Sequence, residues 1–209
     1  MLILASASPR RQELLRNAGI SFIVEPTDIP EVPAPGEKPK EFVERLAREK
    51  ARTIAQPHRH DFVLGADTTV VVDNEILNKP ADDVDAARML GMLSGRTHQV
   101  ITGVCLIGPE DLQGRTENGE LRTESVRSES TLVTFSPLSR QDIAFYVASA
   151  EPMDKAGSYG IQGIASRWIS RIEGDYFNVV GLPVALVYRM LREAGFEPRE
   201  AAGPSLRSG

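Results

Sequence analysis

The chain has 209 residues, 41% of them apolar, and a formal net charge of −5, so it is long enough to bury a core as one large domain or as two lobes that share a sheet. The acidic balance argues against a protein that binds duplex DNA or RNA, whereas a small phosphate ligand needs only a local group of basic residues. A single cysteine excludes an internal disulfide, no apolar stretch is long enough for a bilayer, and no signal-peptide pattern is visible, so we expect a soluble, cytoplasmic protein.

The chain opens with a predicted strand, a loop of small residues and a helix. Ser8 is a good N-cap and Pro9 suits the first helical position, so we expect this helix to begin here and to close near Gly19. Arg10 and Arg11 occupy its first turn, where free N–H groups and the positive end of the helix dipole favour a phosphate. The alternative is a helix start with solvated arginines, and this stretch alone does not decide.

A predicted strand over 20–24 and a proline-rich loop lead to a helix over Pro39–Ala55. The loop carries Glu31, and loop carboxylates are usually just solvated. Lys50 falls in the apolar stripe of the helix, where a core residue is expected. It either extends its amine to the edge of the core or meets an anion in a cleft.

An acid in an apolar run is the feature that most needs an explanation. Residues 62–72 are apolar and β-branched, which predicts two strand pieces joined at residues 65–66, followed by a hairpin that turns at 73–74. Asp67 interrupts this run, and a charge there needs a partner, a cation or the mouth of a cleft. Lys79 returns from the hairpin toward the same place. The alternative is that Asp67 simply caps a turn.

Alternating helices and strands are predicted beyond the hairpin. They are a helix over 81–93, strands over 99–107 and 131–135, a helix from Ser139 to about 149, a strand over 167–172 and a last helix from Pro183. Residues 108–129 predict a long exposed hairpin arm, and 174–178 predict a loop.

A glycine-rich segment over 151–163 has the composition of a ligand-binding loop. Its Gln162 carries a donor and an acceptor on one amide, which matches a pyrimidine edge with an N–H between carbonyls. The alternative is a turn that the amide itself stabilises.

Four basic residues and two acids are each unusual for their positions: Arg10, Arg11, Lys50, Lys79, Asp67 and Glu31. Arginine and lysine offset the charge of a triphosphate, and one or two carboxylates suffice to hold Mg²⁺. A metal-bound water near a carboxylate can attack phosphorus. The set therefore favours triphosphate hydrolysis over glycosidase chemistry, which needs no basic group, and over a serine hydrolase, because no G-x-S-x-G motif is present.

Six sequence blocks resemble the Maf family of nucleoside triphosphate pyrophosphatases. They keep their order between residue 2 and about residue 194: SASPRR at 6–11, REKA at 48–51, GADT at 65–68, LNKP at 77–80, SGRTH at 94–98, and DKAG through GIQG at 154–163. Jointly these blocks are highly specific, although no single one would be.

The resemblance implies an α/β fold akin to the inosine triphosphatase-like enzymes: a long, twisted mixed sheet flanked by helices, with two lobes and a central cleft. We expect residues 1–196 to form one domain of two lobes and 197–209 to be a flexible tail. The resemblance also implies a homodimer, and cleavage of a nucleoside triphosphate to the monophosphate and diphosphate with Mg²⁺ or Mn²⁺, as in house-cleaning of nucleotide pools.

The resemblance further implies roles for individual residues. Asp67 corresponds to the proton acceptor, with Lys50 and Lys79 as further catalytic residues and with Asp67 and Glu31 as metal ligands. The substrate-binding positions are Ser6, Arg10, Arg11, Thr68 and Gln162. Residues 159–162 look like the branch of the family that prefers dTTP and UTP, whereas the branch acting on 7-methylguanosine triphosphate reads differently there.

Three questions stay open at this point. Asp67 can be ligand, base or both. The substrates can instead be modified nucleotides, such as pseudouridine or 5-methyl pyrimidine triphosphates. The protein can also be a non-enzymatic regulator of cell division and septum formation that acts through a protein partner.

Overall fold

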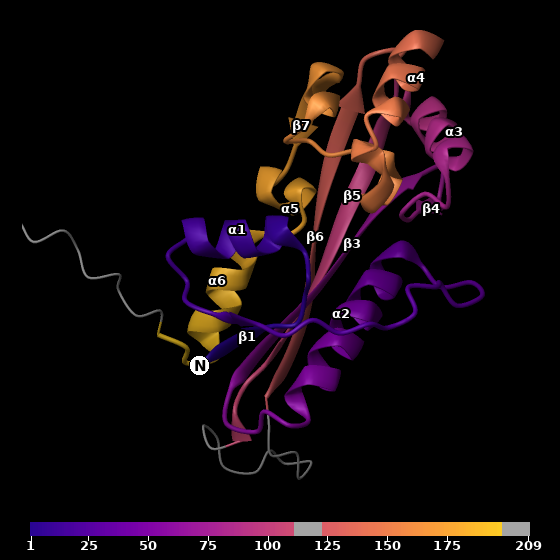
Figure 1. The fold of residues 1–209 in the computed structure, drawn as a ribbon. Coiled ribbons are helices and arrows are strands. Elements are labelled where there is room, and N and C mark those ends of the chain that lie inside the picture. The colour runs from indigo at the N-terminus through magenta and orange to yellow at the C-terminus, as the bar shows by residue number, and fades with distance from the viewer. Residues whose placement is uncertain (111–122, 198–209) are drawn as a thin grey trace, which may run out of the picture.

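The computed structural model describes residues 1–110 and 123–197 (Figure 1). Residues 111–122 of the expected arm and 198–209 of the expected tail therefore lie outside the described residues. The chain forms β1 (Leu2–Leu4), α1 (Pro9–Asn17), β2 (Ile23–Val24), α2 (Pro39–Ala55), β3 (Phe62–Val72), β4 (Glu75–Leu77), α3 (Asp83–Leu93), β5 (Thr97–Ile107), β6 (Glu124–Phe135) and α4 (Arg140–Ala148). Three short 3₁₀ helices follow, η2 (Glu151–Asp154), η3 (Ala156–Ser158) and η4 (Ile164–Arg167), and then β7 (Ile169–Glu173), α5 (Tyr176–Val180) and α6 (Val184–Glu193).

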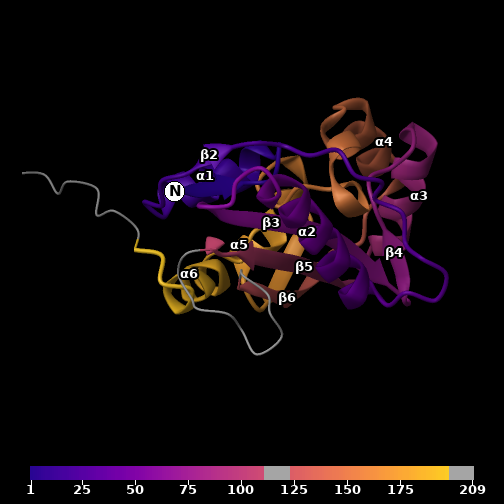
Figure 2. The same cartoon turned by 90° about the horizontal axis from the view of Figure 1, so that it is seen from below.

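A mixed sheet of seven strands organises the described residues, in the order β2-β1-β3-β5-β6-β7 with β4 added beside β3. β1 runs parallel to β2 and β3, whereas β3, β5, β6 and β7 pair antiparallel in turn. Figures 1 and 2 both place α3 and α4 at one end of the long strands and α6 toward the other. The predicted α/β class, a mixed sheet flanked by helices, is confirmed.

Alternate residues of the long strands feed different cores, as the period of a strand requires. On β3, Leu64 and Ala66 join the core with α1 and α6, while Val63 joins the core with α2. Farther along the same strand, Val70 joins a separate core with α3 and α4. Asp67 thus lies on β3 between two apolar clusters, where side chains from both halves of the chain can surround it.

Several local predictions are confirmed by side-chain contacts. Ser8 caps α1, and Pro9 occupies its first turn. Ser139 and Asp142 form the reciprocal capping box of α4. α2 has the predicted bounds, and Lys50 is buried in its apolar stripe.

Three other predictions about the strands and loops are wrong. β3 is one continuous strand rather than two pieces, because residues 65–66 keep their pairing with β5. β6 begins at Glu124, so residues 124–129 belong to the sheet rather than to an exposed arm, although they carry polar side chains. Asp175 caps the short helix α5 where a loop was expected.

Two strand boundaries also differ from the prediction. β2 spans only Ile23–Val24, and β7 begins two residues late, at Ile169. On α6, Leu186 and Met190 are buried, whereas Tyr188 is 46% exposed. None of the described helices combines the length and the apolar character that crossing a membrane requires.

Close backbone contact between α2 and the sheet sets the position of Lys50. A Cβ added to Gly65 on β3 would lie 2.2 Å from the Ala47 carbonyl oxygen of α2, and one added to Gly103 on β5 would lie 2.3 Å from the Val43 carbonyl oxygen. Only glycine allows the helix backbone to approach this closely. The helix therefore rests directly on the two strands, with Lys50 above Asp67.

We expect Gly65→Ala to lower the free energy of unfolding by about 2–3 kcal/mol, because the new methyl group must push α2 off the sheet. Gly91→Ala is the matched control: Gly91 lies within α3 and an added Cβ meets nothing within 4 Å. That control should gain about 0.5–1 kcal/mol from helix propensity. Urea unfolding of both variants measures the two effects, and equal stabilities would contradict the packing described here.

Candidate active site

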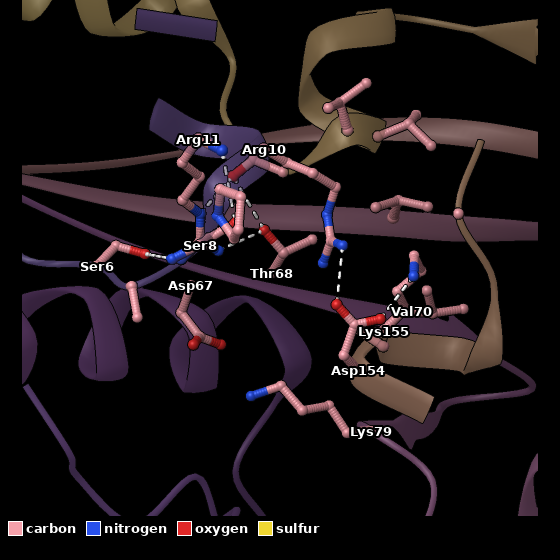
Figure 3. A pocket seen from close by; sticks show the side chains of 18 of the residues that line it. Ser6, Ser8, Arg10, Arg11, Asp67, Thr68, Val70, Lys79, Asp154 and Lys155 are labelled. Atoms are coloured by element: carbon pink, nitrogen blue, oxygen red, sulfur yellow. Dashed lines mark hydrogen bonds and ion pairs between the residues drawn. The ribbon is translucent and has the colours of Figure 1, made fainter. Parts of the chain in front are cut away.

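A cleft of ≈ 580 Å³ opens beside the middle of β3 (Figure 3). This volume is in the range of small-molecule sites. Its walls come from the β1–α1 loop, the start of α1, β3, the residues after β4, and the segment over 151–163. All nine residues singled out from the sequence line it: Ser6, Arg10, Arg11, Glu31, Lys50, Asp67, Thr68, Lys79 and Gln162.

A buried ion pair lies at the base of the cleft. The Lys50 Nζ donates to Asp67 Oδ1 at 2.6 Å and to Glu31 Oε1 at 2.6 Å. The side chains of Lys50 and Asp67 are each only 9% exposed, whereas that of Glu31 is 34% exposed. One ammonium group therefore holds two carboxylates together, and the alternative that Asp67 caps a turn does not apply to a residue in the middle of a strand.

The two carboxylates differ in their affinity for a proton. Burial raises the pKa of Asp67 above its ordinary value, against the opposing effect of the Lys50 and Arg11 charges. Burial would also raise the pKa of Glu31, but its hydrogen bonds to Lys50 and Lys79 and their charges lower it to about 2. Neighbouring acids whose pKa values are pushed apart can take different roles.

Two residues after β4 fix the loop that carries Glu31. The Lys79 Nζ donates to Glu31 Oε2 at 3.0 Å, and the Asn78 side-chain amide donates to the Glu31 carbonyl at 3.3 Å. Asn78 in turn accepts a hydrogen bond from Thr69 on β3. Sequence reasoning missed Asn78, and the only available signal was its place before Lys79 in the block LNKP.

Arg11 is a buried brace between three segments. Its Nε donates to the Gly181 carbonyl at 2.8 Å, and its other nitrogens donate to Ser6 Oγ at 3.1 Å, the Ala66 carbonyl at 2.9 Å and Thr68 Oγ1 at 3.0 Å. These contacts occupy four of the five N–H groups of a guanidinium. Arg11 therefore fixes Ser6 and Thr68, and among the described residues it has one N–H group left for another acceptor.

Arg10 instead extends across the cleft. Its Nη1 donates to Asp154 Oδ2 at 3.1 Å, and Lys155 also contacts Asp154, as Figure 3 shows. This pair joins the start of α1 to η2. The sequence drew attention to the 151–163 segment but did not identify Asp154 as the partner of Arg10, because the two lie 144 residues apart.

Gln162 lies in a turn that lines the cleft, and the residue is exposed. The turn is closed by the Gly163 N–H, which donates to the Gly160 carbonyl at 3.1 Å.

Thr68 Oγ1 lies 2.9 Å from Thr102 Oγ1, so the Thr68 hydroxyl is hydrogen-bonded within the protein.

Glu31 and Asp67, which share the Lys50 ammonium group, are two carboxylates of the cleft that could hold a metal ion. Across residues 1–110 and 123–197, no group of three or more His, Cys, Asp or Glu side chains could enclose one. Two carboxylates in an open, cation-rich cleft suit Mg²⁺, which is commonly bound by one or two carboxylates together with the phosphates of a substrate.

Comparison with known proteins agrees with this arrangement. The family model described as "Maf-like protein" matches residues 1–194. The dTTP/UTP pyrophosphatase of Koribacter versatilis (strain Ellin345) is 58% identical over 194 residues, which cover 93% of this chain and 94% of that protein. The dTTP/UTP pyrophosphatase of Symbiobacterium thermophilum is 52% identical over 196 residues, covering 93% and 94%.

Among solved structures, a HAM1 protein from Coxiella burnetii aligns with a TM-score of 0.45 at 18% identity, covering 92% of this chain and 98% of that one. The match over residues 1–194 and the two relatives are sufficient on their own: the chain belongs to the Maf family.

Proposed function

We propose that this protein is a pyrophosphatase that hydrolyses dTTP and UTP to the nucleoside monophosphate and diphosphate. The observation that carries the proposal is the buried Asp67, held by Lys50 in a cleft whose rim carries further cations. The two relatives described above, which bear the name dTTP/UTP pyrophosphatase, support the choice of substrate.

Glu31 and Asp67 would hold a divalent cation, either Mg²⁺ or Mn²⁺. When bound, such a cation neutralises charge on phosphate oxygens and lowers the pKa of a coordinated water. Glu31 suits the role of constant ligand, because its pKa near 2 keeps it ionised at neutral pH.

Asp67 suits the role of general base. Its raised pKa gives it a greater affinity for a proton than an exposed aspartate has. In the proposed step, a water oxygen bonds to the α-phosphorus, its proton passes to Asp67, and the bond from the α-phosphorus to the bridging oxygen breaks. The diphosphate leaves with the electron pair of that bond.

The cations at the rim of the cleft stabilise the leaving diphosphate. Lys79 is 56% exposed, and Figure 3 shows its side chain extending toward Asp67. Arg10 can exchange Asp154 for a phosphate oxygen, because the ion pair is partly exposed and correspondingly weak. Arg11 contributes charge and holds Ser6 and Thr68 in position.

A panel of nucleotides tests the proposal. Purified protein with Mg²⁺ should release diphosphate from dTTP and UTP with kcat/KM values about tenfold or more above those for CTP and 7-methyl-GTP, and removal of the metal with a chelator should abolish release. Higher kcat/KM for pseudouridine or 5-methyl pyrimidine triphosphates would favour modified nucleotides as substrates. Cleavage of no nucleotide would contradict the proposal and favour a regulator of cell division.

The homodimer implied by the family stays a prediction, which light scattering in solution tests.

A further inference from the structure

We propose that Tyr146 and Glu151 are positioning residues that hold Gln162 at the angle needed to select the pyrimidine base. The inference rests on the proposed function and adds to it a pair of residues outside the reacting centre. Tyr146 lies on α4 and Glu151 begins η2, and both contact the turn that carries Gln162.

A chain of hydrogen bonds holds both ends of this turn. The Gly160 N–H donates to Tyr146 Oη at 3.1 Å, and the Tyr146 hydroxyl donates to Glu151 Oε1 at 2.9 Å. At the other end, the Ile164 N–H donates to the two Glu151 oxygens at 3.2 and 3.1 Å. The turn that is closed between Gly160 and Gly163 is thereby held at one end by Tyr146 of α4 and at the other end by Glu151 of η2.

Packing leaves Tyr146 and Glu151, which together form a clamp on the turn, little freedom to move. Tyr146 is fully buried, and its ring lies 5.6 Å from the Trp168 ring. A Cβ added to Gly163 would lie 2.1 Å from Glu151 Oε1, so the carboxylate is packed directly against the turn. Side chains held by packing and hydrogen bonds on this scale preorganise a neighbouring site.

Gln162 itself is held only through its backbone. Its side chain is exposed and lines the cleft, and within the described part of the chain it makes no hydrogen bond. The whole amide is therefore available to a ligand, and the direction in which it points depends on the turn beneath it.

This direction matters because one amide must distinguish similar bases. Uracil and thymine present an N–H between two carbonyl groups, whereas cytosine presents an acceptor nitrogen beside an amino group. An amide with one donor and one acceptor discriminates between these edges only if it meets them in a fixed orientation. Loosening the turn should therefore reduce selectivity before it affects the chemistry at phosphorus.

The test compares UTP and CTP as substrates of Tyr146→Phe, which removes one hydroxyl and keeps the ring. The kcat/KM ratio of UTP over CTP should fall about tenfold, mainly through a higher KM for UTP with kcat little changed. Glu151→Gln should act in the same direction and serves as a second variant if the first is poorly folded. Tyr188→Phe, at an exposed tyrosine on α6, is the matched control and should keep the wild-type ratio.

A double-mutant cycle with Gln162→Ala separates positioning from a general structural role. Once Gln162 is gone, Tyr146→Phe should cause no further loss of selectivity, because its effect acts through that amide. An unchanged UTP/CTP ratio in both clamp variants, or additive losses in the double variant, would overturn the inference. Wild-type protein that cleaves neither nucleotide would instead overturn the proposed function.

Discussion

Asp67→Asn is expected to reduce the release of diphosphate from dTTP and UTP by about 10³-fold while leaving the chain folded. The amide has nearly the shape of the carboxylate but cannot take a proton from water. The structure predicts that the fold survives, because Lys50 keeps its 2.6 Å hydrogen bond to Glu31 and so is not left as an isolated buried charge. Steady-state kinetics together with circular dichroism measure both parts of this prediction.

Asp73→Asn provides the matched control for this substitution. Asp73 has a φ of 50° in the β3–β4 turn, a conformation that asparagine adopts readily, and its side chain is 65% exposed. The control should keep wild-type turnover. Turnover of Asp67→Asn close to that of the control, in a folded protein, would show that Asp67 is not the base.

Lys50→Met is expected to have the largest effect on stability. It removes the ammonium group that lies 2.6 Å from both Asp67 and Glu31 and leaves the buried Asp67 carboxylate without that partner. Breaking a buried ion pair in this way costs about 3–5 kcal/mol of the free energy of unfolding. Urea unfolding at neutral pH measures this loss.

The same variant should shift the pH dependence of the reaction. Burial raises the pKa of Asp67, and among the charges that oppose this rise, that of Lys50 has the largest effect. Without it the pKa of Asp67 rises further, so the carboxylate becomes protonated at a higher pH and the acid limb of kcat/KM moves upward. Lys40→Met, at an exposed lysine on the same helix, should change neither stability nor the pH profile. An acid limb that stays in place would contradict a direct contact between Lys50 and the catalytic carboxylate.

Local sequence rules predicted the parts of the fold that local interactions determine. The cap at Ser8, the capping box at Ser139 and the bounds of α2 follow from contacts within a few residues. Lys50 stood out because a charge interrupted an apolar stripe, and the structure places it against the anions that such a charge requires.

Tertiary contacts determined what the sequence did not reveal. Pairing with β5 holds the polar residues 124–129 in β6, although their side chains suggest an exposed arm. Gly65 suggests a break between two strands, but the strand is continuous there. Glycine is required at this position because the backbone of α2 lies directly against it. The brace formed by Arg11 depends on acceptors from three separate segments, and no spacing rule connects these with the start of a helix.

The most direct test of the account is hydrolysis of dTTP in water enriched in heavy oxygen, followed by mass spectrometry of both products. Attack on the α-phosphorus by a water that Asp67 deprotonates predicts that the heavy oxygen enters the thymidine monophosphate, and that Asp67→Asn forms almost no labelled product. Heavy oxygen in the diphosphate, or undiminished labelling by the folded Asp67→Asn variant, would contradict the mechanism.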